Sequence, residues 1–188
     1  MFKIFVLLCA IISLPVFAAD SSPSIRIEPL YGVEHTNNQY PEPARYSTRT
    51  FFGLRVLAGY TLLSLELEGT QANGRRDFPS QNLKSEDQAQ RAMIGLRSTI
   101  PATQWLGIFA RGGARASKEK TTITDTATGI KTVKEPPLQW DPYAGAGIQL
   151  ALSNILAASA GATYIFTSSG KPDVQYTLGM TLKFGQVR

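Results

Sequence analysis

A single histidine, His35, is the residue of this sequence best suited to acid–base chemistry near neutral pH. Catalysis by histidine needs a nucleophile or an orienting partner within hydrogen-bond reach. No serine stands two residues after His35, and the surrounding stretch VEHTNN matches no catalytic motif. We therefore expect a solvated loop histidine, no catalytic residue and no enzymatic activity.

Charged residues are the second group with a spacing that matters, because they recur at alternate positions of several short segments. Residues at this period share one face of a β-strand. Leaving a charge unpaired away from water costs several kcal/mol, so we expect opposite charges on this face to pair. With Glu34 as a further carboxylate, the expected ion-pair network consists of Arg26, Glu28, Arg49, Arg55, Glu66, Glu68, Arg91, Arg97, Arg111, Arg115, Asp141 and Lys183.

Other signatures of chemistry are missing. The sequence contains no Walker loop, zinc-ligand spacing, EF-hand or nucleophile elbow. The stretch GAGIQL at 145–150 begins like a dinucleotide-binding fingerprint but lacks its last glycine and a following helix. We expect neither a cofactor nor a metal ion.

The first residues have the layout of a secretory signal peptide. Lys3 is followed by an apolar run from Ile4 to Leu14, and small residues come after Pro15. The run is shorter than the roughly 20 apolar residues that span a bilayer. We expect residues 1–19 to be removed, with cleavage after Ala18 or Ala19. The only cysteine, Cys9, would be lost with them, so residues 20–188 would contain no disulfide or thiolate site.

The elements that position the charged residues are predicted to be β-strands. Apolar and polar residues alternate over eight segments, a period that is typical of strands with two different faces. No segment is a convincing helix. The predicted strands cover 24–34, 48–60, 63–69, 90–100, 106–116, 140–152, 156–166 and 174–184.

The connections alternate between long and short. Short turns are expected at 60–62, 101–104 and 153–154, and a modest loop at 168–173. Long polar loops are expected at 35–45, 71–87 and 118–137. A soluble sandwich gives no reason for this segregation, whereas outer-membrane barrels place short turns in the periplasm and long loops outside.

Two features indicate that the apolar face points at lipid and the polar face into a barrel. Glycines such as Gly95, Gly147 and Gly179 crowd the polar face, which suits a narrow interior filled by long side chains. Aromatic residues of the apolar face gather near the strand ends, as at the two membrane interfaces: Trp140, Tyr164, Phe166 and Tyr176 at one end, Tyr60 and Phe184 at the other. We predict an all-β fold, an eight-stranded antiparallel up-and-down transmembrane β-barrel. A soluble periplasmic β-sandwich is the alternative.

The chain resembles the small eight-stranded outer-membrane barrels of the OmpA/OmpX type, from Ser24 to Phe184. The last strand is similar to the C-terminal assembly signal of that family through Thr177, Gly179, Leu182 and Phe184. The resemblance implies that the barrel assembly machinery recognises this strand. We expect the protein to reside in the bacterial outer membrane as a monomer. Some barrels of this size are lipid A-modifying enzymes that pair a histidine with a serine.

The expected function is that of a non-enzymatic outer-membrane barrel whose loops make structural, adhesive or receptor-type contacts. A lipid A-modifying enzyme and a narrow pore remain alternatives. The net charge of +5 becomes +4 without Lys3 and is scattered, which gives no support for nucleic-acid binding. Besides membrane lipid, lipopolysaccharide is a candidate partner, because basic residues of the long loops would lie near its phosphates: Arg75, Arg76, Lys118 and Lys120. The stretch at 121–133 is expected to extend into a raised hairpin.

Overall fold

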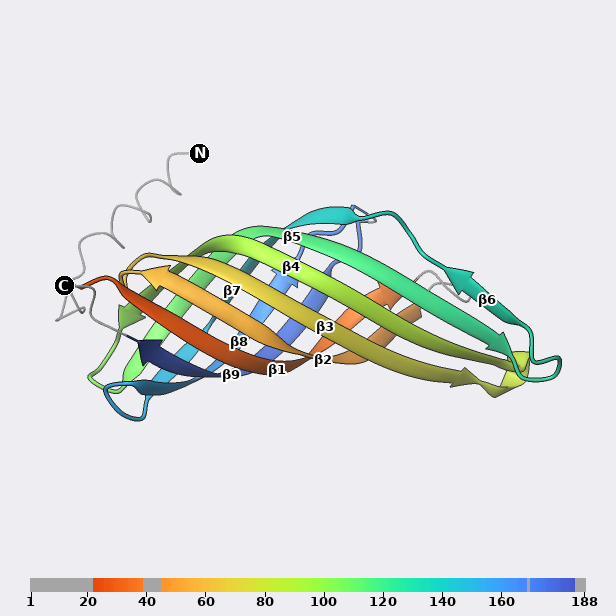
Figure 1. Ribbon diagram of the computed structural model, residues 1–188, viewed down its shortest axis with the longest axis horizontal. Helices are drawn as coiled ribbons and strands as arrows, with labels where there is room; N and C mark the ends of the chain where they lie inside the picture. Colours follow the sequence, from red (N-terminus) through yellow and green to blue (C-terminus); the bar gives the residue numbers. More distant parts are fainter. Residues whose placement is uncertain (1–21, 39–44, 169, 185–188) are drawn as a thin grey trace.

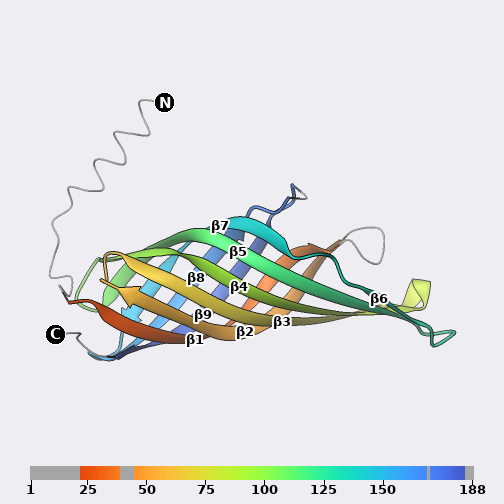
Figure 2. The same ribbon diagram turned by 45° about the horizontal axis from the view of Figure 1, so that its top comes forward.

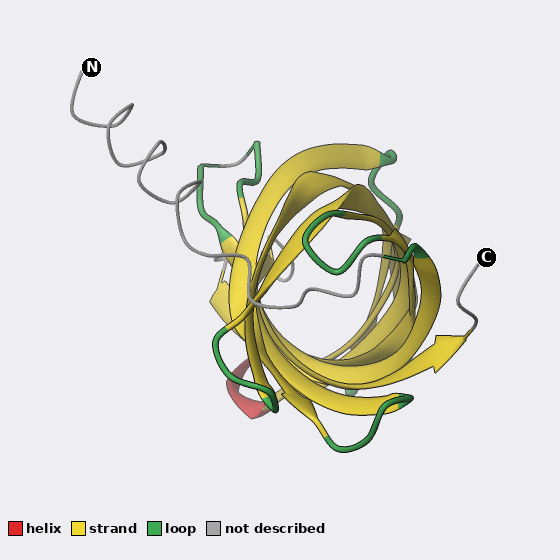
Figure 3. Cartoon of the chain, turned by 90° about the vertical axis from the view of Figure 1, so that its left-hand side faces the viewer, coloured by secondary structure: helices red, strands yellow, loops and turns green. Residues whose placement is uncertain are grey.

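The chain forms a closed ring of antiparallel strands (Figures 1 and 3). The computed structural model describes residues 22–38, 45–168 and 170–184. Each strand pairs with its neighbours along the ring, and the first and last strands pair from Ile25–Phe184 to His35–Val174. This pairing closes the barrel, so the predicted eight-stranded barrel is confirmed and the open sandwich is excluded.

The ring contains eight of the nine strands, and β6 pairs only with the outer part of β5. The signal peptide predicted at 1–19 lies outside the described residues. The strands are β1 (Ser24–Asn38), β2 (Arg45–Gly59), β3 (Ser64–Phe78), β4 (Leu83–Pro101), β5 (Leu106–Asp125), β6 (Lys131–Lys134), β7 (Gln139–Ala151), β8 (Leu156–Ile165) and β9 (Asp173–Phe184).

The alternation of residue types along each strand separates two faces. Apolar side chains point away from the barrel axis and remain exposed, as for Trp140 (65 %) and Leu178 (63 %). Polar and charged side chains point inward and are buried. A water-soluble protein would bury the first set, so the outer face is one that lipid covers. This apolar belt includes Ile25, Tyr31, Phe52, Leu54, Leu65, Leu67, Ile94, Leu96, Ile108, Trp140, Ile148, Tyr164, Tyr176, Leu178 and Met180.

One end of the barrel carries only short connections. Residues 60–63, 102–105 and 152–155 link neighbouring strands there, and β1 begins and β9 ends at the same end (Figure 1). In two of these turns a hydroxyl oxygen accepts the backbone N–H that starts the next strand: Thr103 from Leu106, at 3.0 Å, and Ser153 from Leu156, at 3.2 Å. Short turns face the periplasm in outer-membrane barrels, so we name this the periplasmic end.

At the opposite, outer end, β3, β4 and β5 continue well beyond the other strands of the ring (Figure 2). Pairing between β2 and β3 stops at Thr50–Asn73, whereas β3 and β4 stay paired to Phe78–Leu83. A single 3₁₀ turn, η1 (Pro79–Gln81), joins them. We call the projecting part the raised sheet. It consists of 74–78 of β3, 83–87 of β4, 121–125 of β5, and β6.

The raised sheet corrects the predicted loops at 71–87 and 118–137. These residues are mostly strand because the backbone pairing continues although the apolar residues of the outer face have ended. The hairpin expected within 121–133 does form, through β5–β6 pairing from Thr121–Lys134 to Thr124–Lys131. Among the residues that the structure describes, no helix has the length and apolar character needed to cross a bilayer.

Glycines on the inner face make room for large inward side chains. A side-chain carbon at Gly147 or Gly161 would collide with the ring of Phe109, and one at Gly95 would collide with the Tyr143 hydroxyl. The inward aromatic residues therefore depend on these glycines, as the crowded interior of an eight-stranded barrel requires.

Candidate functional site

The centre of the lumen holds a cluster of three guanidinium and three carboxylate groups from five consecutive strands. Arg55 of β2 lies 3.2 Å from Glu28, 3.6 Å from Glu66 and 2.7 Å from Glu68. Arg97 of β4 pairs with Glu28 at 3.0 Å. Arg111 of β5 lies 3.0 Å from both Glu66 and Glu68. All six residues are buried, so every charge of this central cluster is matched away from solvent.

Aromatic groups and hydroxyls complete the central cluster. The Tyr143 hydroxyl donates to Glu66 at 3.1 Å, and the guanidinium of Arg97 stacks 3.8 Å from the centre of the Phe109 ring. Ser159 donates to the second oxygen of Glu28. A cavity of about 10 Å³ remains beside Arg55 and Phe109, barely the space of one water molecule. The centre of the lumen is thus filled by side chains.

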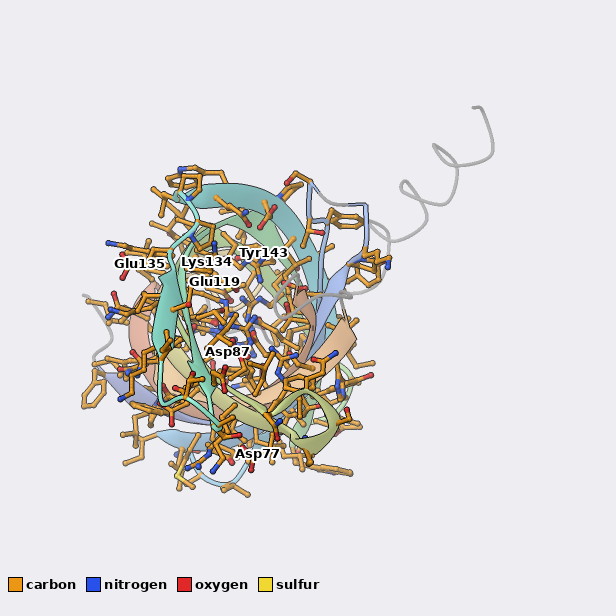
Figure 4. The ribbon with its side chains drawn as sticks, turned by 90° about the vertical axis from the view of Figure 1, so that its right-hand side faces the viewer. Asp77, Asp87, Glu119, Lys134, Glu135 and Tyr143 are labelled. Atoms are coloured by element: carbon orange, nitrogen blue, oxygen red, sulfur yellow. The ribbon has the colours of Figure 1, made fainter. Side chains whose placement is uncertain are left out.

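A second set of charges lies nearer the outer end. Glu34 pairs with Arg49 at 3.1 Å and with Arg91 at 2.6 Å, and both arginines also reach Glu119. Arg115 bridges Asp141 at 2.8 Å and Asp173 at 3.1 Å. Asp87 accepts from Thr121 at 2.9 Å and from Arg76 at 2.8 Å. Figure 4 looks into this end and shows Asp87 near the middle, with Asp77 and Glu135 toward the edge.

Four members of this outer set were not predicted from the sequence. Arg76, Asp87, Glu119 and Asp173 were expected in loops, whereas they lie on strands with inward side chains. The signal was present, because Asp87 and Glu119 continue the alternate-position spacing of Arg91 and Arg115. The pattern was not recognised as strand because the residues on the other face are no longer apolar there.

Arg26 and Lys183 differ from the rest of the predicted network. Both face the lumen near the periplasmic end and stand directly opposite each other in the β1–β9 pair. Arg26 donates to the carbonyl of Tyr60 at 3.4 Å, and no carboxylate of the described residues forms an ion pair with it. The charge of Arg26 is attracted to that of Glu28 without a direct ion pair between the two groups, so its pairing with an acidic group stays a prediction.

His35 lies on the outer face near the end of the apolar belt. Its Nδ1 is 2.9 Å from the Thr48 hydroxyl, and its ring meets Tyr176 edge to face at 6.0 Å. No acidic residue of the described chain hydrogen-bonds this ring. The pair lacks the third, orienting group of a catalytic triad.

The assembly-signal residues occupy both faces of β9. Thr177 and Gly179 point into the lumen, and a side chain at Gly179 would strike Glu28. Leu182 and Phe184 are exposed on the outer face beside the periplasmic end. The outer face of β9 is therefore apolar up to its last described residue, and recognition of this strand by the assembly machinery stays a prediction.

The four basic residues predicted to contact lipopolysaccharide do not lie together. Lys118 and Lys120 project outward from β5 just beyond the belt residue Ala116, and Lys120 pairs with Glu135 at 3.0 Å. Arg75 is exposed further out, 3.9 Å from Asp77. Arg76 turns to the inner side, where Asp87 holds it. Alternation along β3 separates Arg75 from Arg76, so Arg76 does not share the outward surface.

Comparison with known proteins gives a fold but no family. No family profile and no curated protein matches the sequence. The structure is similar to that of Ail, the attachment invasion locus protein of Yersinia pestis, with a TM-score of 0.58 and 13 % identity over 87 % of this chain and 99 % of Ail. It is also similar to OprG from Pseudomonas aeruginosa, with a TM-score of 0.56 and 12 % identity over 89 % of this chain and 98 % of OprG.

Identities this low establish the shared fold alone. The closed ring, the lipid-facing belt and the charged, filled lumen define a small β-barrel of the bacterial outer-membrane type. A barrel with this exterior is stable only where lipid surrounds it, and the outer membrane is the location of this class.

Proposed function

We propose that the protein is a non-enzymatic outer-membrane barrel that binds a partner outside the cell through its raised sheet. The observation that carries this proposal is that three strands and an added hairpin project beyond the belt, where the barrel itself does not need them. Ordering these extra strands costs conformational entropy. Binding to a partner would offset this cost and would explain why the strands are present.

The raised sheet has two edges that no described strand covers. Residues 74–78 pair only with β4, and β6 pairs only with β5. Open edges can take up an extended peptide segment as an added strand. Exposed apolar side chains lie beside the β6 edge, namely Ile130, Val133 and Leu138. The best-supported partner is therefore a protein that presents an extended segment.

Lipopolysaccharide remains a second candidate ligand at a different level of the surface. Lys118 and Lys120 project outward where the belt ends, which is the depth of the phosphates in the outer leaflet. Glutamine side chains on the neighbouring strands, Gln71, Gln88 and Gln90, line a groove with them, and so do Glu119 and Glu135, the latter paired with Lys120. The amide and ammonium donors among them suit phosphate and sugar oxygens.

The alternatives of an enzyme and a pore have less support. The His35–Thr48 pair has no acidic partner, which weakens acyl-chain chemistry. The filled centre of the lumen weakens conduction. Insertion through the barrel assembly machinery and a monomeric state stay part of the proposal, through the outward Leu182 and Phe184 and the closed ring without a free edge in the membrane.

The test is to shorten the raised sheet while keeping the barrel. Residues 122–133 are replaced by Asn-Gly, a two-residue turn that joins the paired residues Thr121 and Lys134. A control variant exchanges Ala127 and Thr128 for serine and leaves every strand pair in place. Cells displaying each variant are compared for adherence to epithelial monolayers, to immobilised heparin and to lipopolysaccharide. Heparin is included because Ail was crystallised with a heparin analogue, sucrose octasulfate.

We expect the shortened variant to lose adherence to one of these surfaces and the control variant to retain it. Heat-modifiable migration on gels shows that both barrels fold. Equal adherence of the parent and the shortened variant to every surface would contradict the proposed function.

A further inference from the structure

The outer edge of β6 presents the backbone groups of two residues at the margin of the raised sheet (Figure 1). The Asp125 N–H donates to the carbonyl of Ile130 at 2.9 Å, in the same register as the β5–β6 ladder. Hydrogen-bonded and non-hydrogen-bonded pairs alternate along an antiparallel ladder. The N–H and carbonyl groups of Lys131 and Val133 therefore point away from β5, to a side where no described strand pairs with β6.

The length of this edge is limited by the residues that follow it. Pro136 and Pro137 come two and three positions after the end of β6. Proline has no N–H group and cannot donate to a ladder. A segment added to β6 would therefore gain few backbone hydrogen bonds, chiefly those to Lys131 and Val133. Most of its selectivity would have to come from side chains.

The side chains of these two residues share one face of the hairpin. Lys131 stands opposite Thr124 and Val133 opposite Thr122, on the outward face of β5 that also carries Lys120. Both side chains are exposed, Val133 by 50 %. The outward face of β6 thus offers a cation and an apolar group two positions apart.

The carboxylates closest to this edge in the sequence are engaged elsewhere. Glu135 pairs with Lys120 at 3.0 Å. The Asp125 carboxylate accepts the backbone N–H groups of Ala127 and Thr128 within the turn, at 2.8 and 3.2 Å. The positive charge of Lys131 is therefore directed at what approaches from outside.

The other open edge, residues 74–78, has a balanced set of charges. Arg75 lies 3.9 Å from Asp77, and Arg76 is held by Asp87 at 2.8 Å. Only the β6 edge combines a basic side chain with exposed apolar ones among the described residues of the raised sheet. A second copy of β6 is a poor occupant, because lysines would then face lysines and like charges in facing positions repel.

We propose, resting on the function proposed above, that the partner presents an extended acidic segment that adds to β6 as an antiparallel strand. Its carboxylate lies opposite Lys131 and its apolar residue opposite Val133. Facing pairs of opposite charge and facing apolar pairs both stabilise a ladder. Because the added strand runs opposite to β6, the apolar residue precedes the acidic one by two positions in the partner.

The proposal is tested with a capped octapeptide, Thr-Thr-Val-Thr-Glu-Thr-Thr-Gly, titrated onto the full barrel in maltoside detergent. Amide hydrogen exchange is followed residue by residue by NMR. We expect the amides of Lys131 and Val133 to become protected along a saturable curve, because both gain an acceptor. The amide of Thr132 already bonds to β5 in the inferred pattern and should change little.

Modified peptides show whether the backbone of the probe pairs with the edge. N-methylation of its valine and glutamate removes the two N–H groups that would face β6, and we expect the protection to disappear. N-methylation of the threonine between them is the matched control. That N–H points away from β6 in the proposed ladder, so this peptide should bind like the unmodified one.

Charge exchange tests the side-chain pair. Lys131→Glu should weaken binding of the octapeptide about twofold to fivefold, and a peptide with lysine in place of glutamate should recover it. Lys84→Glu makes the same change of charge on the exposed outward face of β4, away from the edge, and should bind like the parent. Heat-modifiable migration on gels shows that each variant folds.

Three results would overturn the proposal: no saturable protection of Lys131 and Val133 in the parent, equal binding of the doubly methylated peptide, or equal weakening by Lys84→Glu and Lys131→Glu. The last result would mean a general attraction to anions. These failures are distinct from a failure of the proposed function. If shortening the raised sheet abolishes adherence and Lys131→Glu leaves it unchanged, the acidic segment is refuted and the role of the raised sheet is not.

Discussion

Glu28 is the residue whose loss should be most costly to the barrel. It is completely buried and, among the described residues, is the only carboxylate that forms an ion pair with Arg97. Glu28→Gln keeps the shape of the side chain but leaves the guanidinium groups of Arg55, Arg97 and Arg111 facing only Glu66 and Glu68. The perturbation therefore creates one uncompensated charge at the centre of the lumen.

The expected magnitude follows from this charge. Removing one partner of a buried ion pair costs about 3–5 kcal/mol. Arg97 keeps its hydrogen bond to Gln149 at 3.0 Å and its contact with the Phe109 ring, so we expect the lower part of that range. In the double variant Glu28→Gln, Arg97→Gln the remaining cluster is again balanced. Its cost should be smaller than that of Glu28→Gln alone.

The assay is equilibrium unfolding in urea of the barrel inserted in vesicles, followed by tryptophan fluorescence. Trp105, in the turn at 102–105, and Trp140, on the apolar belt, are both exposed near opposite ends of the barrel, so their emission should change when the barrel unfolds and leaves the lipid. Glu86→Gln on the raised sheet is the matched control, since Glu86 is exposed and such changes stay within about 0.5 kcal/mol. A cost below about 1 kcal/mol for Glu28→Gln, or a double variant less stable than the single one, would refute the reasoning.

Four further predictions concern other parts of the molecule. Leu178→Arg on the apolar belt should cost about 2–4 kcal/mol in the same urea assay, whereas Leu178→Phe should be tolerated. Phe184→Asp should leave the protein unassembled in the periplasm, seen as loss of heat-modifiable migration in outer-membrane fractions; normal assembly would show that Phe184 is no part of the signal. In planar bilayers the parent should show no stable conductance, because the central cluster fills the lumen, and regular channel openings would refute this. The backbone N–H groups of Ala127 and Thr128 hold the pKa of exposed Asp125 below its ordinary value of about 3.9. The carboxylate of Asp125 therefore stabilises the β5–β6 turn fully above about pH 3.9, and this stabilisation is lost as the pH falls through the lowered pKa. Protection of the hairpin amides from hydrogen exchange should decrease only in that acidic range, and equal protection at pH 2 and pH 6 would contradict this prediction.

The barrel architecture could be predicted from the sequence because the side of the sheet to which each side chain points is set locally along the strand. In a strand, consecutive side chains point to opposite faces whatever the strand pairs with. The alternation of Leu178 and Met180 with Thr177 and Gly179 therefore predicted both the strand and its lipid-facing side, and the structure agrees. The turns near 60–62, 101–104 and 153–154 were equally local and were also predicted correctly.

The same local rule failed where a strand left the membrane. Beyond Gln90 and Lys118 the two faces of β4 and β5 are mostly polar, with Leu83, Ala89 and Ile123 as exceptions, so the sequence there resembles a loop. What keeps these residues extended is their pairing with each other, as in Glu86–Thr122. Such pairing joins residues more than thirty positions apart, and no window along the chain contains both of them.

The partners of the lumen charges were decided only by the tertiary structure. The sequence placed Glu28, Arg97 and Arg26 on one face but gave no means to tell which of them meet. Glu28 and Arg97 are 69 positions apart and lie on strands that are not neighbours, yet their side chains meet across the lumen. Arg26, two residues before Glu28, lies opposite Lys183 in the β1–β9 pair and donates to the carbonyl of Tyr60. The depth of each side chain depends on the register between strands and on the tilt that ring closure imposes, and closure is set by the first and last strands together.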